Sequence, residues 1–222
     1  MSIEIVLLSL ESILLIVTII LLIYSIKEGK QRNKLILEMG KATKVLTRQE
    51  YFLAILDSMM DAKEEITGCI TGRLPSGDDK RMVRDITANI ERMTKKGVRV
   101  RYLMPKFPDR LHLGYLYMKA GAEILYSSCL MVHNIRFIVI DDRIVVIGIP
   151  ESIGEREATK KGYRIPSEGL AMMLKNYLDS CEKQSNFTEY LKEVISQTGA
   201  TPEHIAREYQ IDERELKKLA GT

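Results

Sequence analysis

Residues 132–148 read VHNIRFIVIDDRIVVIG and contain the strongest β-strand signal in the chain. Val, Ile and Phe fill both halves of this stretch, and the polar triplet Asp141-Asp142-Arg143 separates them. β-Branched and aromatic residues favour strands, and a short polar interruption between two such runs favours a tight turn. We therefore predict a β-hairpin whose two strands are joined at the triplet.

Helical and strand patterns alternate on the N-terminal side of this hairpin. The predicted elements are a helix at 49–63, a strand at 64–71, a helix capped by Ser76 or Asp78 and ending at 95–97, a strand at 98–104, a helix at 109–120 and a strand at 122–127. After the hairpin, we expect a polar loop at 150–166 and a helix at 167–183. This order calls for an α/β domain with a mainly parallel sheet and helices on its faces.

A long apolar run opens the chain. Residues 5–26 read IVLLSLESILLIVTIILLIYSI, with Glu11 as the single charge. About 20 apolar residues are needed to cross the roughly 30 Å hydrocarbon layer of a bilayer. A cleaved signal peptide is disfavoured because no basic region precedes the run and no small-residue cleavage motif follows it. We predict one transmembrane helix over residues 1–26.

Basic residues follow this run directly, in a segment that we place at 27–48. The first of them are Lys27, Lys30, Arg32 and Lys34. Cations beside a spanning helix favour the cytoplasmic side, which predicts a single-pass protein of the cell membrane with its N-terminus outside and the rest of the chain in the cytoplasm. The same cations can bind anionic lipid headgroups, at about 1 kcal/mol each. A plain topology signal is the alternative explanation.

Composition limits the possible functions of the remaining chain. With 45% hydrophobic and 28% charged residues, the 222-residue chain is typical of a globular protein, and a net charge of +3 gives no indication of nucleic-acid binding. Its three cysteines, Cys69, Cys129 and Cys181, are odd in number and widely spaced, so we expect buried thiols in a reducing compartment. No metal, flavin or nicotinamide motif is present, and no cofactor is expected.

The segments DAKEEI, KKGVRVRYLMPK and KAGAEI, together with the hairpin, resemble the phospholipase D superfamily over residues 49–184. The resemblance implies a mixed, mainly parallel sheet flanked by helices. The family's motif is His-x-Lys-x4-Asp, followed after six residues by Gly. Here Arg136, Asp141 and Gly148 occupy the Lys, Asp and Gly positions, whereas Asn134 stands where the family has its histidine, and His133 lies one residue early.

This one-residue offset matters on a strand, because successive side chains point to opposite faces. If the strand reaches back to residue 132, Asn134 shares a face with Arg136, and His133 points away. Asparagine cannot form the covalent phosphoenzyme that the resemblance implies, so the family's catalysis would be absent. Alternatively, a bulge at Asn134 turns His133 into the site, and two chains together form a metal-independent phosphodiesterase of phospholipase D or nuclease type.

We expect the remaining site to bind an anion. Arg136 offers a planar fork that suits phosphate or carboxylate, with Asn134, Asp141 and Glu151 as neighbours. A structural ion pair of Arg136 with Asp141 or Glu151 is the alternative. The resemblance also implies a homodimer, because single-motif members build their site from two chains. The favoured function is a non-catalytic regulatory module that binds a phosphate-containing ligand or a partner protein.

Residues 185–222 form a predicted helical tail with the spacing of a helix-turn-helix. The candidate recognition helix carries Asp212, Glu213 and Glu215 at its N-terminal end, the end that usually enters the DNA groove. Carboxylates at that end repel phosphates. A membrane-bound transcriptional regulator therefore stays an alternative, and contact with a protein is favoured over DNA.

Overall fold

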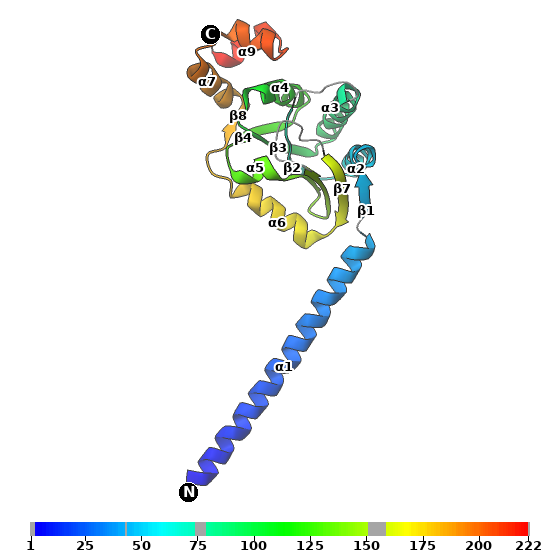
Figure 1. The fold of residues 1–222 in the computed structure, drawn as a ribbon, viewed down its shortest axis with the longest axis vertical. Coiled ribbons are helices and arrows are strands. Elements are labelled where there is room, and N and C mark those ends of the chain that lie inside the picture. Colours follow the sequence, from blue (N-terminus) through cyan, green and yellow to red (C-terminus); the bar gives the residue numbers. More distant parts are fainter. Residues whose placement is uncertain (1–2, 43, 74–78, 151–158, 222) are drawn as a thin grey trace. The chain divides into compact units, whose positions relative to one another are not determined.

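The computed structural model describes residues 3–42, 44–73, 79–150 and 159–221 (Figure 1). The chain divides into two units, Met1–Thr43 and Lys44–Thr222. The first unit is a single helix, α1 (Ile3–Ala42). Its segment Leu10–Lys30 has a mean hydropathy of 2.2 and is long and apolar enough to cross a membrane. The side chains of this segment are exposed, which is costly in water and favourable in a lipid layer.

Helix α1 continues through the basic residues. Lys27 and Lys30 are exposed on its surface, and Arg32 and Lys34 lie in the same helix. The globular unit begins earlier than expected, because Lys44–Thr47 is a strand, β1, that belongs to the sheet. The predicted segment 27–48 is therefore divided between the end of α1 and the first strand of the domain.

The globular unit contains one eight-stranded mixed sheet. Its other strands are β2 (Glu65–Cys69), β3 (Arg99–Pro105), β4 (Glu123–Ser127), β5 (Arg136–Ile140), β6 (Ile144–Pro150), β7 (Thr159–Pro166) and β8 (Ser185–Asn186). They are arranged in the order β1-β7-β6-β5-β2-β3-β4-β8. This confirms the predicted α/β fold with a mixed sheet and the β5–β6 hairpin. The parallel part is smaller than predicted, because in the described chain only β2–β3 and β3–β4 are parallel pairs.

Helices cover both faces of this sheet (Figure 1). They are α2 (Arg48–Met60), α3 (Asp79–Lys95), the 3-10 turn η1 (Pro108–Arg110), α4 (Leu111–Lys119), α5 (Leu130–Asn134), α6 (Glu168–Asp179), α7 (Phe187–Thr198), α8 (Pro202–Glu208) and α9 (Glu213–Ala220). Helices α2, α3, α4 and α7 pack on the larger core, and α5 and α6 pack on the smaller one. The predicted caps Ser76 and Asp78 lie outside the described residues.

Side chains that alternate between the two faces of β5 contribute to both hydrophobic cores. Ile138 and Ile140 belong to the larger core, whereas Phe137 and Val139 belong to the smaller core under α6. A strand buried on both faces reads as a continuous apolar run, which explains the strong signal in its sequence.

The predicted separate tail, residues 185–222, is part of the same compact unit. Strand β8 pairs with β4, and Phe187 and Leu191 of α7 are buried in the larger core. Helix α9 is attached to α4 through Glu215, which accepts hydrogen bonds from Tyr115 Oη and Lys119 Nζ. These contacts extend the domain through its C-terminal helices.

Candidate functional site

The candidate site begins at Arg136, the first residue of β5. Because β5 runs antiparallel to β2, Phe137 lies opposite Cys69, the last residue of β2. Arg136 therefore lies at the edge of the sheet where the parallel strands end. In α/β sheets, ligands commonly bind beyond this carboxyl edge. Here Arg136 pairs in register with Gly148 of β6, which in turn pairs with Gly162 of β7.

Helix α2 contributes Tyr51 to the surroundings of Arg136. The Tyr51 ring rests on Gly162, where an added Cβ would lie 2.4 Å from the ring's Cδ2 atom. Burial raises the pKa of the Tyr51 phenol, and the positive charge of Arg136 acts in the opposite direction. Half-buried Arg136 shares the sheet face of Ile138 and Ile140, which pack in the larger core together with Tyr51. Tyr51 and Gly162 were not predicted as part of the site, and only the glycine within a short apolar run could have suggested a close approach.

His133 and Asn134 lie on α5, which corrects the prediction that they belong to a strand. The strand begins at Arg136, so the alternation argued from the sequence does not reach residue 134. The exposed His133 ring makes an edge contact with Phe107, with 5.3 Å between ring centroids. Phe107 follows β3, whereas Tyr51 packs over β7, on the other side of β5. Arg136 shares a sheet face with Ile138 and Ile140 of the larger core, whereas His133 contacts Phe107 after β3.

Asn134 is the last residue of α5, and its side chain is outside the described part of the structure, as is all of Glu151. Their predicted role in anion binding stays a prediction.

Asp141 lies at the opposite end of β5 from Arg136. Its carboxylate accepts hydrogen bonds from the backbone N–H groups of three successive residues, Lys63, Glu64 and Glu65, at 2.8–3.0 Å. Burial acts to raise the pKa of this carboxyl, but the three N–H groups and the charge of Arg143 outweigh it and hold the pKa below its usual value. Asp141 thus fastens the connection between α2 and β2, and it forms neither the predicted anion site nor an ion pair with Arg136.

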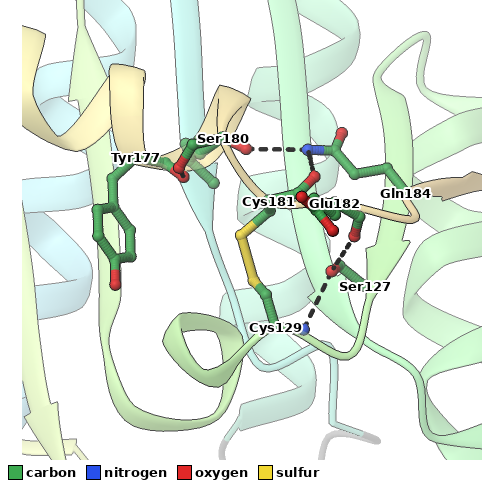
Figure 2. Close-up of a disulfide and its surroundings, with 8 residues drawn as sticks. Ser127, Cys129, Tyr177, Ser180, Cys181, Glu182 and Gln184 are labelled. Carbon is green, nitrogen blue, oxygen red and sulfur yellow. Dashed lines mark hydrogen bonds between the residues drawn. A yellow bond between two sulfur atoms is a disulfide. The ribbon is translucent and has the colours of Figure 1, made fainter.

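The cysteines differ from the prediction of three free thiols. Cys129 and Cys181, separated by 52 positions, form a disulfide between the start of α5 and the end of α6 (Figure 2). Sequence spacing could not reveal this bond, because the fold alone brings the two helices together. Cys69 is a free buried thiol, and burial raises its pKa to about 12 despite the nearby charge of Arg136. It stays protonated at neutral pH and is a poor nucleophile.

Two further features, the absence of a metal-ligand cluster among the described residues and a cavity elsewhere on the sheet, limit the possible chemistry and location of the site. Among the described residues, no group of three or more His, Cys, Asp and Glu side chains could hold a metal ion. A cavity of about 570 Å³ lies at the opposite edge of the sheet. Its cations already form ion pairs, Lys175 with Glu65 and Arg101 with Asp179, both at 2.7 Å. We centre the candidate site on Arg136 because it lies at the carboxyl edge of the parallel strands.

Comparison with known proteins shows which solved structures share this architecture. No protein-family model and no curated protein matches the sequence. Among solved structures, Nuc from Salmonella typhimurium, a phospholipase D family member, superposes with a TM-score of 0.50 at 16% identity, over 65% of this chain and 97% of Nuc. The chain has the phospholipase D fold. The phospholipase D resemblance predicted from the hairpin is thus confirmed at the level of the fold.

Other solved structures are similar at lower scores. NucT from Helicobacter pylori matches with a TM-score of 0.48 at 15% identity, over 63% of this chain and 96% of NucT. Phosphatidylserine synthase from Haemophilus influenzae matches with a TM-score of 0.48 at 13% identity, over 81% of this chain and 45% of the synthase. At 16% identity, the similarity to Nuc shows the fold and leaves the activity of this chain to its own residues.

Proposed function

We propose that this protein is a membrane-anchored phospholipase D-fold module that binds a phosphate-containing or other anionic ligand at Arg136 without hydrolysing it. The placement of His133 carries the proposal. A nucleophilic imidazole has to reach the same phosphorus atom whose oxygens the neighbouring cation binds. His133 instead contacts Phe107 beyond β3, whereas Arg136 lies on the sheet face of Ile138 and Ile140, which pack with Tyr51 of α2 in the larger core.

The surroundings of Arg136 favour an anion. Arg136 is half-buried, and electrostatic attraction is stronger in such a position than in bulk water. Because the pKa of Tyr51 is raised, the phenol stays neutral at physiological pH and adds no negative charge beside the arginine. A planar guanidinium can donate two parallel hydrogen bonds to one phosphate group.

The N-terminal helix would hold this module at a membrane. We place the globular unit on the cytoplasmic side, because the basic residues from Lys27 to Lys34 follow the apolar run directly. In this position the same lysines can contact anionic headgroups, and the ligand of Arg136 can be a headgroup phosphate or a soluble one.

The contacts of α9 weigh against the DNA-binding alternative. Glu215, near the helix N-terminus, is bonded to Tyr115 and Lys119 of α4, and Leu216 is buried in the core. Reading DNA with this end would break these contacts and bring Asp212 and Glu213 against phosphates. A role in contacts with protein fits the tail better.

Calorimetric titration of the full chain in detergent micelles tests the proposal. The titrants are inorganic phosphate and a soluble short-chain phosphatidic acid, which separate a free phosphate from a lipid headgroup. Arg136→Ala should weaken binding about 10- to 100-fold, since hydrogen bonds to charged groups contribute about 1.5–3 kcal/mol. Arg99→Ala is the control, because its side chain is 80% exposed at the opposite edge of the sheet. Equal affinities of these two variants would contradict the proposal.

Hydrolysis provides the second test. Without added metal, the wild-type chain should leave a phosphodiester reporter intact. Turnover that His133→Ala abolishes would establish the alternative, a phosphodiesterase that uses this histidine.

A further inference from the structure

The connector 128–135, between β4 and β5, carries His133 and leads directly into Arg136. Most of its described side chains face solvent: Leu130 is 76% exposed and Ile135 is 40% exposed. Among the connector's described side chains, Val132, at 2% exposed, is the one that is deeply buried, in the smaller core. A segment with so little apolar burial is weakly held by packing alone.

The disulfide is the strongest attachment of this connector. Cys129 is bonded to Cys181, and beside this bond Ser127 Oγ donates a 3.3 Å hydrogen bond to the Glu182 carbonyl. The Cys129 N–H in turn donates to Ser127 Oγ at 3.1 Å. Figure 2 shows these groups gathered at the end of α6. The long Ser127 hydrogen bond is a weak substitute for the covalent bond.

The α6 side of the disulfide is firmly fixed. Gln184 Nε2 donates to the Leu178 carbonyl at 2.9 Å and to the Cys181 carbonyl at 3.0 Å, which closes the end of the helix. Cys181 is 8% exposed, and Leu178 is buried in the smaller core. Breaking the disulfide would therefore leave Cys181 in place and release the connector.

We infer that the Cys129–Cys181 disulfide is a redox switch that controls anion binding at Arg136 through the connector. The inference rests on the proposed function. Disulfides in the cytoplasm of most organisms are transient and often act in redox sensing. On the cytoplasmic side this bond is exposed to reduction by cellular dithiols, and the connector that its loss frees leads directly into Arg136.

The switching reaction needs a dithiol reductant, either a small molecule or a dithiol protein. Its thiolate attacks Sγ of Cys129, the more exposed of the two sulfurs, and the Cys181 thiolate leaves and takes up a proton. The second thiol of the reductant then displaces Cys129, which also becomes a thiol. The protein gains two electrons and two protons, and the reductant becomes a disulfide.

Thiol counting establishes the state of the protein. Native full-length protein in micelles should incorporate no maleimide when oxidised and two after reduction, because release of the connector uncovers Cys181 whereas Cys69 stays buried. After denaturation, the oxidised protein should incorporate one maleimide and the reduced protein three. Incorporation of two maleimides in protein that was never exposed to reductant would overturn the inference.

Two measurements on these samples test the switch. Amide hydrogen exchange across the connector should accelerate on reduction, and phosphate affinity should fall about tenfold, a typical coupling between linked sites. The double variant Cys129→Ser/Cys181→Ser should have the hydrogen exchange and the phosphate affinity of the reduced protein, and adding reductant should change neither. Cys69→Ala should keep the full response.

Each remaining outcome has one meaning. Unchanged exchange, or faster exchange with unchanged phosphate affinity, overturns the switch and leaves the proposed anion site standing. Absence of phosphate binding in both states overturns the anion site, and the switch with it.

Discussion

Replacing Asp141 with alanine should destabilise the globular unit and leave ligand binding by the folded protein unchanged. The carboxylate accepts three backbone hydrogen bonds, two from exposed amides and one from a partly buried amide. Water can replace the acceptor for the exposed pair, so we assign about 0.5–1 kcal/mol to each of these and about 1–2 kcal/mol to the third. The expected loss is about 2–4 kcal/mol. For a domain of this size it lowers the melting temperature by roughly 4–16 °C.

The pH dependence of this loss follows from the lowered pKa of Asp141. A carboxyl whose pKa is depressed by folding stabilises the protein above its unfolded pKa, and this stabilisation disappears as the pH falls through the folded pKa. The gap between wild type and Asp141→Ala should therefore be complete at pH 7 and shrink below about pH 4. Thermal unfolding followed by circular dichroism of the full chain in micelles measures both effects.

Asp142→Ala is the matched control. Asp142 is the next residue, 49% exposed, and pairs with Lys175 at 2.8 Å. Exposed pairs of this kind contribute about 0–1 kcal/mol. The reasoning is refuted if Asp141→Ala melts no lower than Asp142→Ala at pH 7, or if the folded Asp141→Ala protein loses phosphate affinity.

Two further substitutions test the packing of the fold. Gly162→Ala should cost about 1–3 kcal/mol in urea titrations, because its methyl group would overlap the Tyr51 ring. Gly169→Ala, in α6 with nothing within 4 Å of the added atom, should instead stabilise by up to about 1 kcal/mol, and a loss there would contradict this explanation. Removing the disulfide with Cys129→Ala/Cys181→Ala should cost up to about 4 kcal/mol, given the 52 positions between the cysteines. Calorimetry should show reduced wild type melting with this variant; a wild type insensitive to reductant would refute the estimate.

The sequence predicted the elements whose signals are local. The hairpin turn at residues 141–143 and the helices α2, α3, α4 and α6 lie within a few residues of their expected bounds. Helix α2, for example, begins with a capping box between Thr47 and Glu50.

The failures have physical causes. Helix α5 has five residues, too few to show a helical period, and its VHN segment adjoins a strong strand. Strand β7 was predicted as loop because Lys160, Lys161 and Gly162 interrupt its apolar residues; it is held by pairing on both sides with β1 and β6. The prediction of the site was the least accurate, because the direction in which the His133 side chain points depends on the residue at which β5 begins.

The two outermost strands of the sheet constrain how two copies of this protein could associate. Strand β8 has two residues and β1 has four, so each offers few backbone groups to another chain. Short border strands of this kind suppress extension of a sheet from one molecule to the next. A homodimer of the kind expected from the phospholipase D resemblance would therefore have to meet through side chains on helices and loops, and its two sheets would stay separate.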